Sequence, residues 1–139
     1  MKKVILTTVT LISLLSACNK KEESVTPTNS APVVSIAEDD RALRISKGGA
    51  YFSYYATATD ANGSISKVIF YVNNTPYDTV LTSSSANKYY NESGYYTSEE
   101  GTYKFHAIAY DNAGASTKSN ELTQSYTVSK IEGQVLISQ

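Results

Sequence analysis

From Ala31 onward the sequence is built of short runs in which apolar and polar residues alternate, separated by turn-forming residues. The runs are 32–36, 51–59, 65–72, 76–82, 95–98, 102–110 and 116–128. A two-residue period is typical of strands with one buried face, and none of this region has a helical period. About seven short strands over about 100 residues predict an all-β, Greek-key β-sandwich.

The alternation also predicts which side chains form the core. In the run 65–72, Val68, Phe70 and Val72 share one face of the strand. The inward residues expected from the second and sixth runs are Phe52, Tyr54, Ala56, Ala58, Tyr103, Phe105, Ala107 and Ala109. The chain has a single cysteine, so no internal disulfide is possible and packing alone must stabilise this core.

The segment from Glu99 to Phe105 has the pattern of a tyrosine corner, with acidic residues and a glycine followed by Tyr103 near the start of a strand. We expect the Tyr103 hydroxyl to hydrogen-bond to the backbone of the corner. Phe105 stands where an immunoglobulin domain has its second cysteine, and Phe70 stands near the position of its buried tryptophan.

Four segments together resemble the bacterial Ig-like domains found in surface proteins and beside the catalytic domains of secreted glycosidases, of the cadherin- and chitinase-associated type. They are 32–36, 56–73, 101–103 and 107–114. The resemblance covers 31–128 and implies an Ig-like fold. It implies little about function, because members of the family serve as spacers, adhesins and accessory binding modules.

The N-terminus indicates where the protein is located. Lys2 and Lys3 precede an apolar stretch, 4–17, that is too short to span a bilayer. The stretch ends in Leu15-Ser16-Ala17-Cys18, which resembles a bacterial lipobox. The resemblance implies cleavage before Cys18 and lipidation of that cysteine, which would anchor the protein to a membrane. An uncleaved anchor or a buried N-terminal helix is the alternative.

The polar residues that follow Cys18 predict a flexible tether. The charged cluster 20–23 resembles the export signal of some Bacteroidota lipoproteins and so implies the outer membrane and the cell surface. A merely solvated tether, with the domain facing the periplasm, is the alternative. The predicted organisation is a signal peptide at 1–17, a tether at 18–30, a domain at 31–128, and a tail or added edge strand at 129–139.

Charge and composition exclude some functions. The leader removes two of the 12 basic residues, which leaves an excess of the 13 acidic ones, so nucleic acid is not an expected partner. The only histidine, His106, is expected to point outward from its strand. No nucleophile motif accompanies it, so the sequence offers no catalytic histidine pair or triad. Glu99 and Glu100 are explained by the corner. We therefore expect no enzyme activity and no organic cofactor.

A calcium site is the only metal site that the sequence suggests. Asp60 and Asn62 follow the second strand and Asp111 and Asn112 follow the sixth, so their oxygens are expected at the same end of the sandwich. The alternative is that these residues only form turns, which Asp, Asn and Gly commonly do.

The chain has 12 tyrosines against three phenylalanines and no tryptophan. The segment 89–96 is expected to form a small hairpin in which one tyrosine of each doublet faces water. The predicted ligand-binding residues are Tyr89, Tyr90, Asn91, Glu92, Tyr95 and Tyr96. Amphipathic rings suit protein interfaces and sugar stacking, although cross-strand pairing that only stabilises the sheet is an alternative.

Asp78-Thr79-Val80 resembles the acceptor for O-linked glycans on exported Bacteroidota proteins, which implies a glycan on Thr79. The combined prediction is a lipid-anchored binding or adhesion module for a glycan or an envelope protein. A structural spacer, or a subunit of a larger envelope complex, is the alternative function.

Overall fold

The computed structural model describes residues 28–40, 44–46, 48–131 and 134–138. None of these residues belongs to a helix long and apolar enough to cross a membrane. The strands are β1 (Val33–Glu38), β2 (Arg44–Ser46), β3 (Gly49–Phe52), β4 (Tyr54–Thr59), β5 (Ile65–Val72), β6 (Thr75–Val80), β7 (Lys88–Tyr90), β8 (Tyr95–Thr97), β9 (Gly101–Asp111), β10 (Ser116–Lys118), β11 (Leu122–Ile131) and β12 (Gln134–Ser138). The all-β prediction is confirmed, with more and shorter strands than expected.

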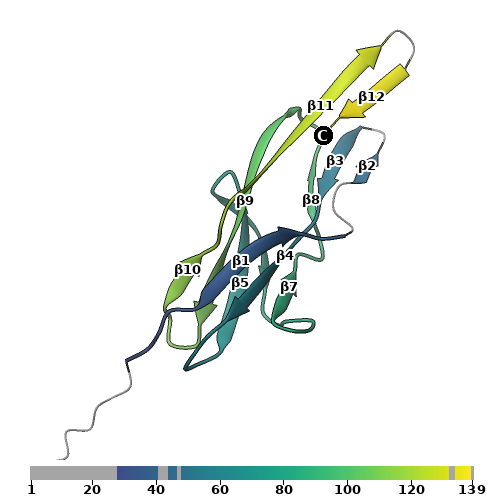
Figure 1. Ribbon diagram of the computed structural model, residues 1–139. Helices are drawn as coiled ribbons and strands as arrows, with labels where there is room; N and C mark the ends of the chain where they lie inside the picture. The colour runs from purple at the N-terminus through teal and green to yellow at the C-terminus, as the bar shows by residue number, and fades with distance from the viewer. Residues whose placement is uncertain (1–27, 41–43, 47, 132–133, 139) are drawn as a thin grey trace, which may run out of the picture.

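Two layers of strands enclose one core (Figure 1). One layer is a sheet in the order β12-β11-β9-β5-β6, with β10 also paired to β9. The other layer consists of the sheets β1-β4-β7 and β2-β3-β8, which continue one another because β3 and β4 are separated by Ser53 alone. The chain changes layer between β4 and β5, between β6 and β7, and between β8 and β9. This order is that of an Ig-like β-sandwich, as predicted.

Aromatic side chains hold the two layers together. Phe105 on β9 is fully buried, and its ring centroid lies 4.5 Å from that of Tyr54 and 5.3 Å from that of Phe52 on the opposite layer. The buried apolar core is Ile36, Ala50, Phe52, Tyr54, Ala56, Ala58, Val68, Phe70, Val72, Tyr89, Tyr103, Phe105, Ala107, Ala109 and Tyr126. Every inward residue predicted above belongs to it. Small alanines on β4 and β9 let the layers approach, and the rings fill the remaining space.

The predicted tyrosine corner is confirmed. The Tyr103 hydroxyl donates a hydrogen bond to the backbone carbonyl of Glu99 at 2.6 Å. It also lies 2.8 Å from the Thr97 hydroxyl oxygen, which in turn accepts a hydrogen bond from the Glu99 backbone N–H at 3.1 Å. These bonds fix the connection from β8 to β9, where the chain passes from one layer to the other.

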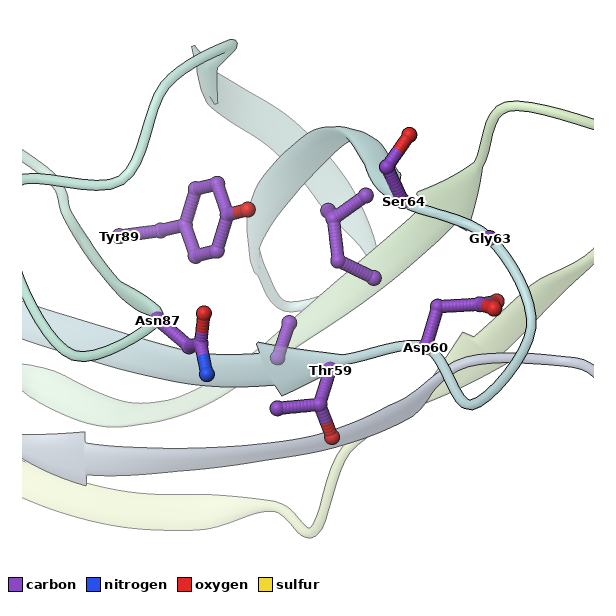
Figure 2. A pocket seen from close by; sticks show the side chains of 8 residues that line it. Thr59, Asp60, Gly63, Ser64, Asn87 and Tyr89 are labelled. Carbon is purple, nitrogen blue, oxygen red and sulfur yellow. The ribbon is translucent and has the colours of Figure 1, made fainter.

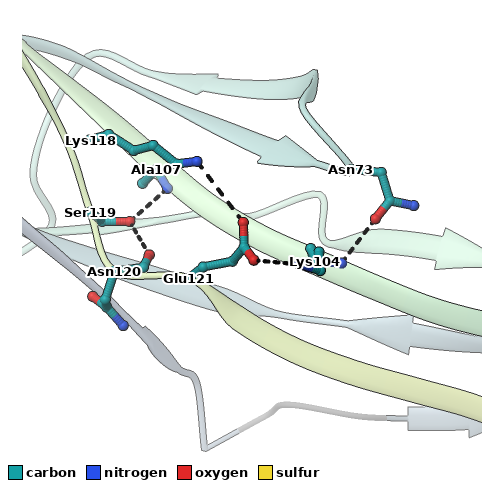
Figure 3. Close-up of polar contacts among 7 residues, drawn as sticks. All are labelled: Asn73, Lys104, Ala107, Lys118, Ser119, Asn120 and Glu121. Carbon is teal, nitrogen blue, oxygen red and sulfur yellow. Dashed lines mark hydrogen bonds and ion pairs between the residues drawn. The ribbon is translucent and has the colours of Figure 1, made fainter.

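The run predicted as one strand over 116–128 is divided into β10 and β11 by the three polar residues at 119–121, two of which bond to the backbone (Figure 3). The Ser119 hydroxyl accepts a hydrogen bond from the Ala107 backbone N–H at 2.9 Å and donates one to the Asn120 carbonyl. The Asn120 amide pairs with the backbone N–H and C=O of Ile36 at 3.0 and 3.2 Å. Side chains therefore take over bonds that a continuous strand would make, and Asn120 links the two layers.

The run predicted over 51–59 is interrupted at Ser53, which is buried. Its carbonyl accepts a hydrogen bond from the Asp39 backbone N–H, and its hydroxyl donates to the Asp39 carboxylate at 3.3 Å.

At the other end of the chain, β12 pairs antiparallel with β11 and lies at the edge of the larger sheet (Figure 1).

The prediction of a hairpin at 89–96 is wrong. Strand β7 pairs with β4, and β8 pairs with β3. Strands β7 and β8 therefore lie one after the other along the same edge of that layer and do not pair with each other. Asn91 to Gly94 form a loop between them because the Asn91 side chain turns inward. Its Oδ1 accepts a hydrogen bond from the Tyr54 backbone N–H at 3.4 Å, and Gly94 adopts a φ of 60°.

Candidate functional site

Four tyrosines lie on the outer face of the layer formed by β3, β4, β7 and β8. Tyr51 is directly opposite Tyr96 in the β3–β8 pair, and Tyr55 is directly opposite Tyr90 in the β4–β7 pair. Their neighbours in sequence point into the core, so the strand alternation turns all four outward. We call these four residues, together with Lys88, the tyrosine face.

The rings of the tyrosine face are held in place by the backbone beneath them. The Tyr51 hydroxyl donates a hydrogen bond to the Ser93 carbonyl at 2.7 Å, and its ring lies where a Cβ on Gly94 would be. The Tyr96 hydroxyl donates to the Gly48 carbonyl at 3.2 Å, and its ring crosses Gly49. Glycines at these two positions therefore leave room for the rings.

The other half of the tyrosine face carries a positive charge. The Tyr55 and Tyr90 ring centroids are 5.4 Å apart, and the Lys88 ammonium lies 4.3 Å from the Tyr55 centroid, within cation–π range. Tyr96 is 55% exposed, whereas Tyr51, Tyr55 and Tyr90 are half-buried. The face is thus aromatic, carries one positive charge and is partly accessible to solvent.

The six residues predicted to bind a ligand are divided between this face and the interior. Tyr90 and Tyr96 belong to the tyrosine face, and Glu92 is exposed in the loop between β7 and β8. Tyr89 and Tyr95 point inward, and Tyr95 packs 5.4 Å from the Tyr77 ring. One member of each tyrosine doublet is therefore turned inward, as expected.

Asn91 corrects the prediction most clearly, because it is fully buried and cannot contact a ligand at the surface. Its side-chain N–H donates to the Tyr77 hydroxyl at 2.7 Å. Burial raises the pKa of Tyr77, so this phenol stays protonated. Asn91 is a structural residue that ties the loop after β7 to the core.

Tyr51 and Tyr55 belong to the tyrosine face but are not among the residues predicted to bind a ligand. They are far in sequence from 89–96, and pairing with β7 and β8 brings them to it. The alternation in the run 51–59 already placed Tyr55 on the outer face, so that signal was present. The partner strand could not be identified from the sequence.

A pocket of about 320 Å³ opens at the other side of β7, where β4 ends and β5 begins (Figure 2). It is lined by Ala58, Thr59, Asp60, Gly63, Ser64, Ile65, Asn87 and Tyr89. The Tyr89 hydroxyl points toward its centre, and the Asn87 side chain lies below that hydroxyl (Figure 2). Because Tyr89 is on the inner side of β7 while Lys88 and Tyr90 are on its outer side, the pocket and the tyrosine face share one edge strand.

The four residues predicted to bind calcium do meet at one end of the sandwich, and hydrogen bonds within the protein occupy many of their oxygens. Asp60 Oδ1 accepts a hydrogen bond from the Asn62 N–H at 2.9 Å, and Asn62 Oδ1 accepts one from the Ser30 N–H. Asn112 Oδ1 accepts one from the Ser64 N–H at 3.0 Å. These contacts fit turn formation.

Asp111 is the most fully bonded member of that group. Its Oδ1 accepts hydrogen bonds from the Ala113 and Ala115 N–H groups, and its Oδ2 accepts one from the Asn29 side chain at 2.7 Å. The bond from Asn29 is the largest cause of the lowered pKa of Asp111. Among the described residues, no group of three or more His, Cys, Asp and Glu side chains is arranged to hold a metal. The calcium site remains a prediction.

His106 points outward from β9, as predicted, but it is covered rather than exposed. Its ring stacks on Tyr71 with centroids 4.8 Å apart and an interplanar angle of 4°, and it is 3% exposed. Burial and then the Lys118 charge lower the pKa of His106, whereas Glu121 opposes the shift. The Glu121 carboxylate bridges Lys104 at 3.1 Å and Lys118 at 3.9 Å (Figure 3). The ring therefore stays neutral beneath a pair of exposed ion pairs.

Of the two predicted modification sites, Thr79 is among the described residues and Cys18 is not. Thr79 is exposed on the edge strand β6, and its backbone N–H donates to the Asp78 carboxylate at 2.8 Å. The signal peptide, Cys18 and most of the tether lie outside the described residues.

Comparison with known proteins gives a similarity in structure alone. No protein-family model matches the chain, and no curated protein matches it. A solved structure of fibronectin(III)-like modules of CbhA from Clostridium thermocellum is 25% identical over 68% of this chain, with a TM-score of 0.47. The matched part makes up 45% of that structure's length.

Proposed function

We propose that this Ig-like β-sandwich is a non-catalytic binding module of the cell envelope, and that its tyrosine face binds a glycan or a protein. The observation that carries the proposal is the gathering of Tyr51, Tyr55, Tyr90 and Tyr96 on one outer face. Tyrosine combines a large apolar ring with a hydroxyl and loses little conformational entropy on binding, so it suits recognition surfaces.

Simple stabilisation of the sheet accounts for only part of this face. The Tyr55–Tyr90 contact is a cross-strand pair of the kind that stabilises sheets. Tyr96 has most of its surface in water, and such an exposed ring gains little from the sheet. The Lys88 ammonium beside the Tyr55 ring adds a hydrogen-bond donor for hydroxyl, carbonyl or carboxylate groups of a partner.

The proposed location of the protein in the cell envelope rests on its N-terminal sequence. A lipidated Cys18 would anchor the module to the outer membrane, with a polar tether between lipid and domain. The cluster 20–23 favours the cell surface, and the periplasmic side is the alternative. Intact-mass measurement of the native protein tests both modifications, because acylation at Cys18 and a glycan at Thr79 each add a defined mass.

A glycan array and a pull-down from the outer-membrane fraction, both with residues 19–139, test the binding role. A saturable glycan or protein ligand is the expected result. A stoichiometric envelope partner that is retained by a variant with all four tyrosines of the face changed would instead favour the spacer or subunit function.

That second function has one observation in its favour. Strand β12 lies at the edge of the larger sheet, and its outer backbone groups have no partner strand among the described residues. An edge of this kind can accept a strand from another protein.

A further inference from the structure

The residues that precede β1, Thr28 to Ser30, lie across one end of the sandwich. All three are exposed and belong to no strand. They are nevertheless hydrogen-bonded to side chains in the turn after β4 and to the last residue of β9. The chain leaves the domain here, at the end opposite the β11–β12 hairpin (Figure 1). We call residues 28–30 the strap.

The Asn62 side chain holds the backbone of the strap. Its Oδ1 accepts a hydrogen bond from the Ser30 backbone N–H at 3.1 Å, and its side-chain N–H donates to the Thr28 carbonyl at 2.9 Å. One amide therefore satisfies a donor and an acceptor that lie two residues apart along the chain. In this respect the Asn62 amide acts on the strap as the backbone of a paired strand would.

Asp111 holds the side chain of the strap. The Asn29 side-chain N–H donates to Asp111 Oδ2 at 2.7 Å. Hydrogen bonds to a carboxylate are stronger than those between neutral groups, so this contact adds to the two made by Asn62. The strap is thus attached at two points, one after β4 and one at the end of β9.

Both attachment points are fixed by their own turns. The Asn62 backbone N–H donates to Asp60 Oδ1 at 2.9 Å, and Asp111 Oδ1 accepts hydrogen bonds from the Ala113 and Ala115 N–H groups. Because these bonds already orient the two side chains, the domain loses little conformational freedom when the strap binds to them.

We infer that residues 28–30 belong to the folded domain and act as a strap that shortens the tether predicted at 18–30. The predicted tether then ends at residue 27 instead of at the start of β1. The five residues 28–32 would span about 16–18 Å if they were extended and unattached. The strap therefore limits how far from the membrane the module can stand, a consequence that rests on the proposed anchor at Cys18.

Backbone ¹⁵N relaxation of the full chain in detergent tests the inference. Order parameters of about 0.8 or more are expected at Asn29 and Ser30, as in rigid backbone, and values below about 0.6 are expected in Asn62→Ala. Alanine keeps the backbone N–H that bonds to Asp60, so the turn itself is retained. Unchanged order parameters in β4 and β9 show that the fold is intact.

Two aspartate variants separate the strap from the effect of an added charge. In Asn62→Asp the donor to the Thr28 carbonyl is lost, so the order parameters of the strap should fall. Asn112→Asp adds the same charge to the turn after β9 and keeps the oxygen that accepts the Ser64 N–H, so the strap should stay ordered. Asn29→Ala removes only the bond to Asp111 and should lower the order parameter at Asn29.

Order parameters below about 0.6 at Asn29 and Ser30 in the unmodified chain would overturn the inference. Values that Asn62→Ala leaves unchanged would also overturn it, as would equal losses in Asn62→Asp and Asn112→Asp. The strap is judged independently of the proposed function. An intact mass without acyl chains would reject the anchor and the limit on reach, while high order parameters that fall in Asn62→Ala would still support the strap.

Discussion

The tyrosine corner offers a sharp test of how the fold is stabilised. In Tyr103→Phe the ring remains in the core, where it is 7% exposed, and only the hydroxyl is lost. That hydroxyl donates to the Glu99 carbonyl at 2.6 Å and contacts the Thr97 hydroxyl at 2.8 Å. The variant therefore removes two hydrogen bonds without leaving a cavity of any size.

The expected cost follows from those two contacts. A net contribution of about 0.5–1.5 kcal/mol for each intramolecular hydrogen bond gives about 1–3 kcal/mol for the pair. Thr97 can turn its hydroxyl toward the Glu99 carbonyl, which is 3.5 Å away, and so recover part of the loss. We therefore expect a loss of about 2 kcal/mol, which is below the upper limit of the range for the pair.

Urea denaturation followed by circular dichroism gives the free energy of unfolding, and a parallel melt gives Tm. A loss of about 2 kcal/mol corresponds to a Tm decrease of about 8–16 °C for a domain of this size. Tyr96→Phe is the matched control, because it removes a hydroxyl that makes one exposed bond to Gly48, and it should cost less than about 0.5 kcal/mol. Equal effects of the two variants would refute the assignment of the corner as the stabilising contact.

Three further predictions test other contacts. Asn120→Ala removes both hydrogen bonds to Ile36 and should lower the free energy of unfolding by about 1–2 kcal/mol. Amide hydrogen exchange in β1 should become faster, and unchanged exchange there would contradict the role of Asn120 in linking the layers. Burial lowers the pKa of His106, so the unfolded chain binds its proton first and stability should fall as the pH drops below about 6.5. His106→Asn should flatten that slope in denaturation measured from pH 7.5 to 5, and an unaltered slope would contradict the assignment. Gly94→Ala should cost at least about 1 kcal/mol through its positive φ. Part of the cost should disappear when Tyr51 is also changed to alanine, because the new Cβ overlaps that ring, and an undiminished cost would show that the ring is not constrained there.

Local periodicity was enough to predict the core but not the pairing of the edge strands. The burial of Val68, Phe70 and Phe105 could be predicted because the alternation of apolar and polar residues along a strand is visible in the sequence itself. The division at Ser119 and Asn120 depends on side-chain bonds to Ala107 and Ile36, which are distant in sequence. Such contacts leave no periodic signal.

The candidate site shows the same limit. The doublets at 89–90 and 95–96 were recognisable, and one member of each is turned inward as predicted, but which member that is was not predicted. The role of Asn91 was not predictable, because a polar residue in a loop is ordinarily exposed and this one is buried by its bonds to Tyr54 and Tyr77. The pocket also required the structure, since Asn87 and Tyr89 come beside the end of β4 only when β4 and β7 pair.

The most direct test of the central claim is a comparison of the Kd of one array-identified ligand for three proteins. They are the unmodified chain, a Tyr55→Ala/Tyr96→Ala variant of the tyrosine face, and Tyr110→Ala, which changes a half-buried tyrosine on the outer face of the opposite layer. Recognition through the tyrosine face predicts that the double variant binds at least tenfold more weakly while Tyr110→Ala binds normally. A ligand that binds the double variant as tightly as the unmodified chain would contradict it.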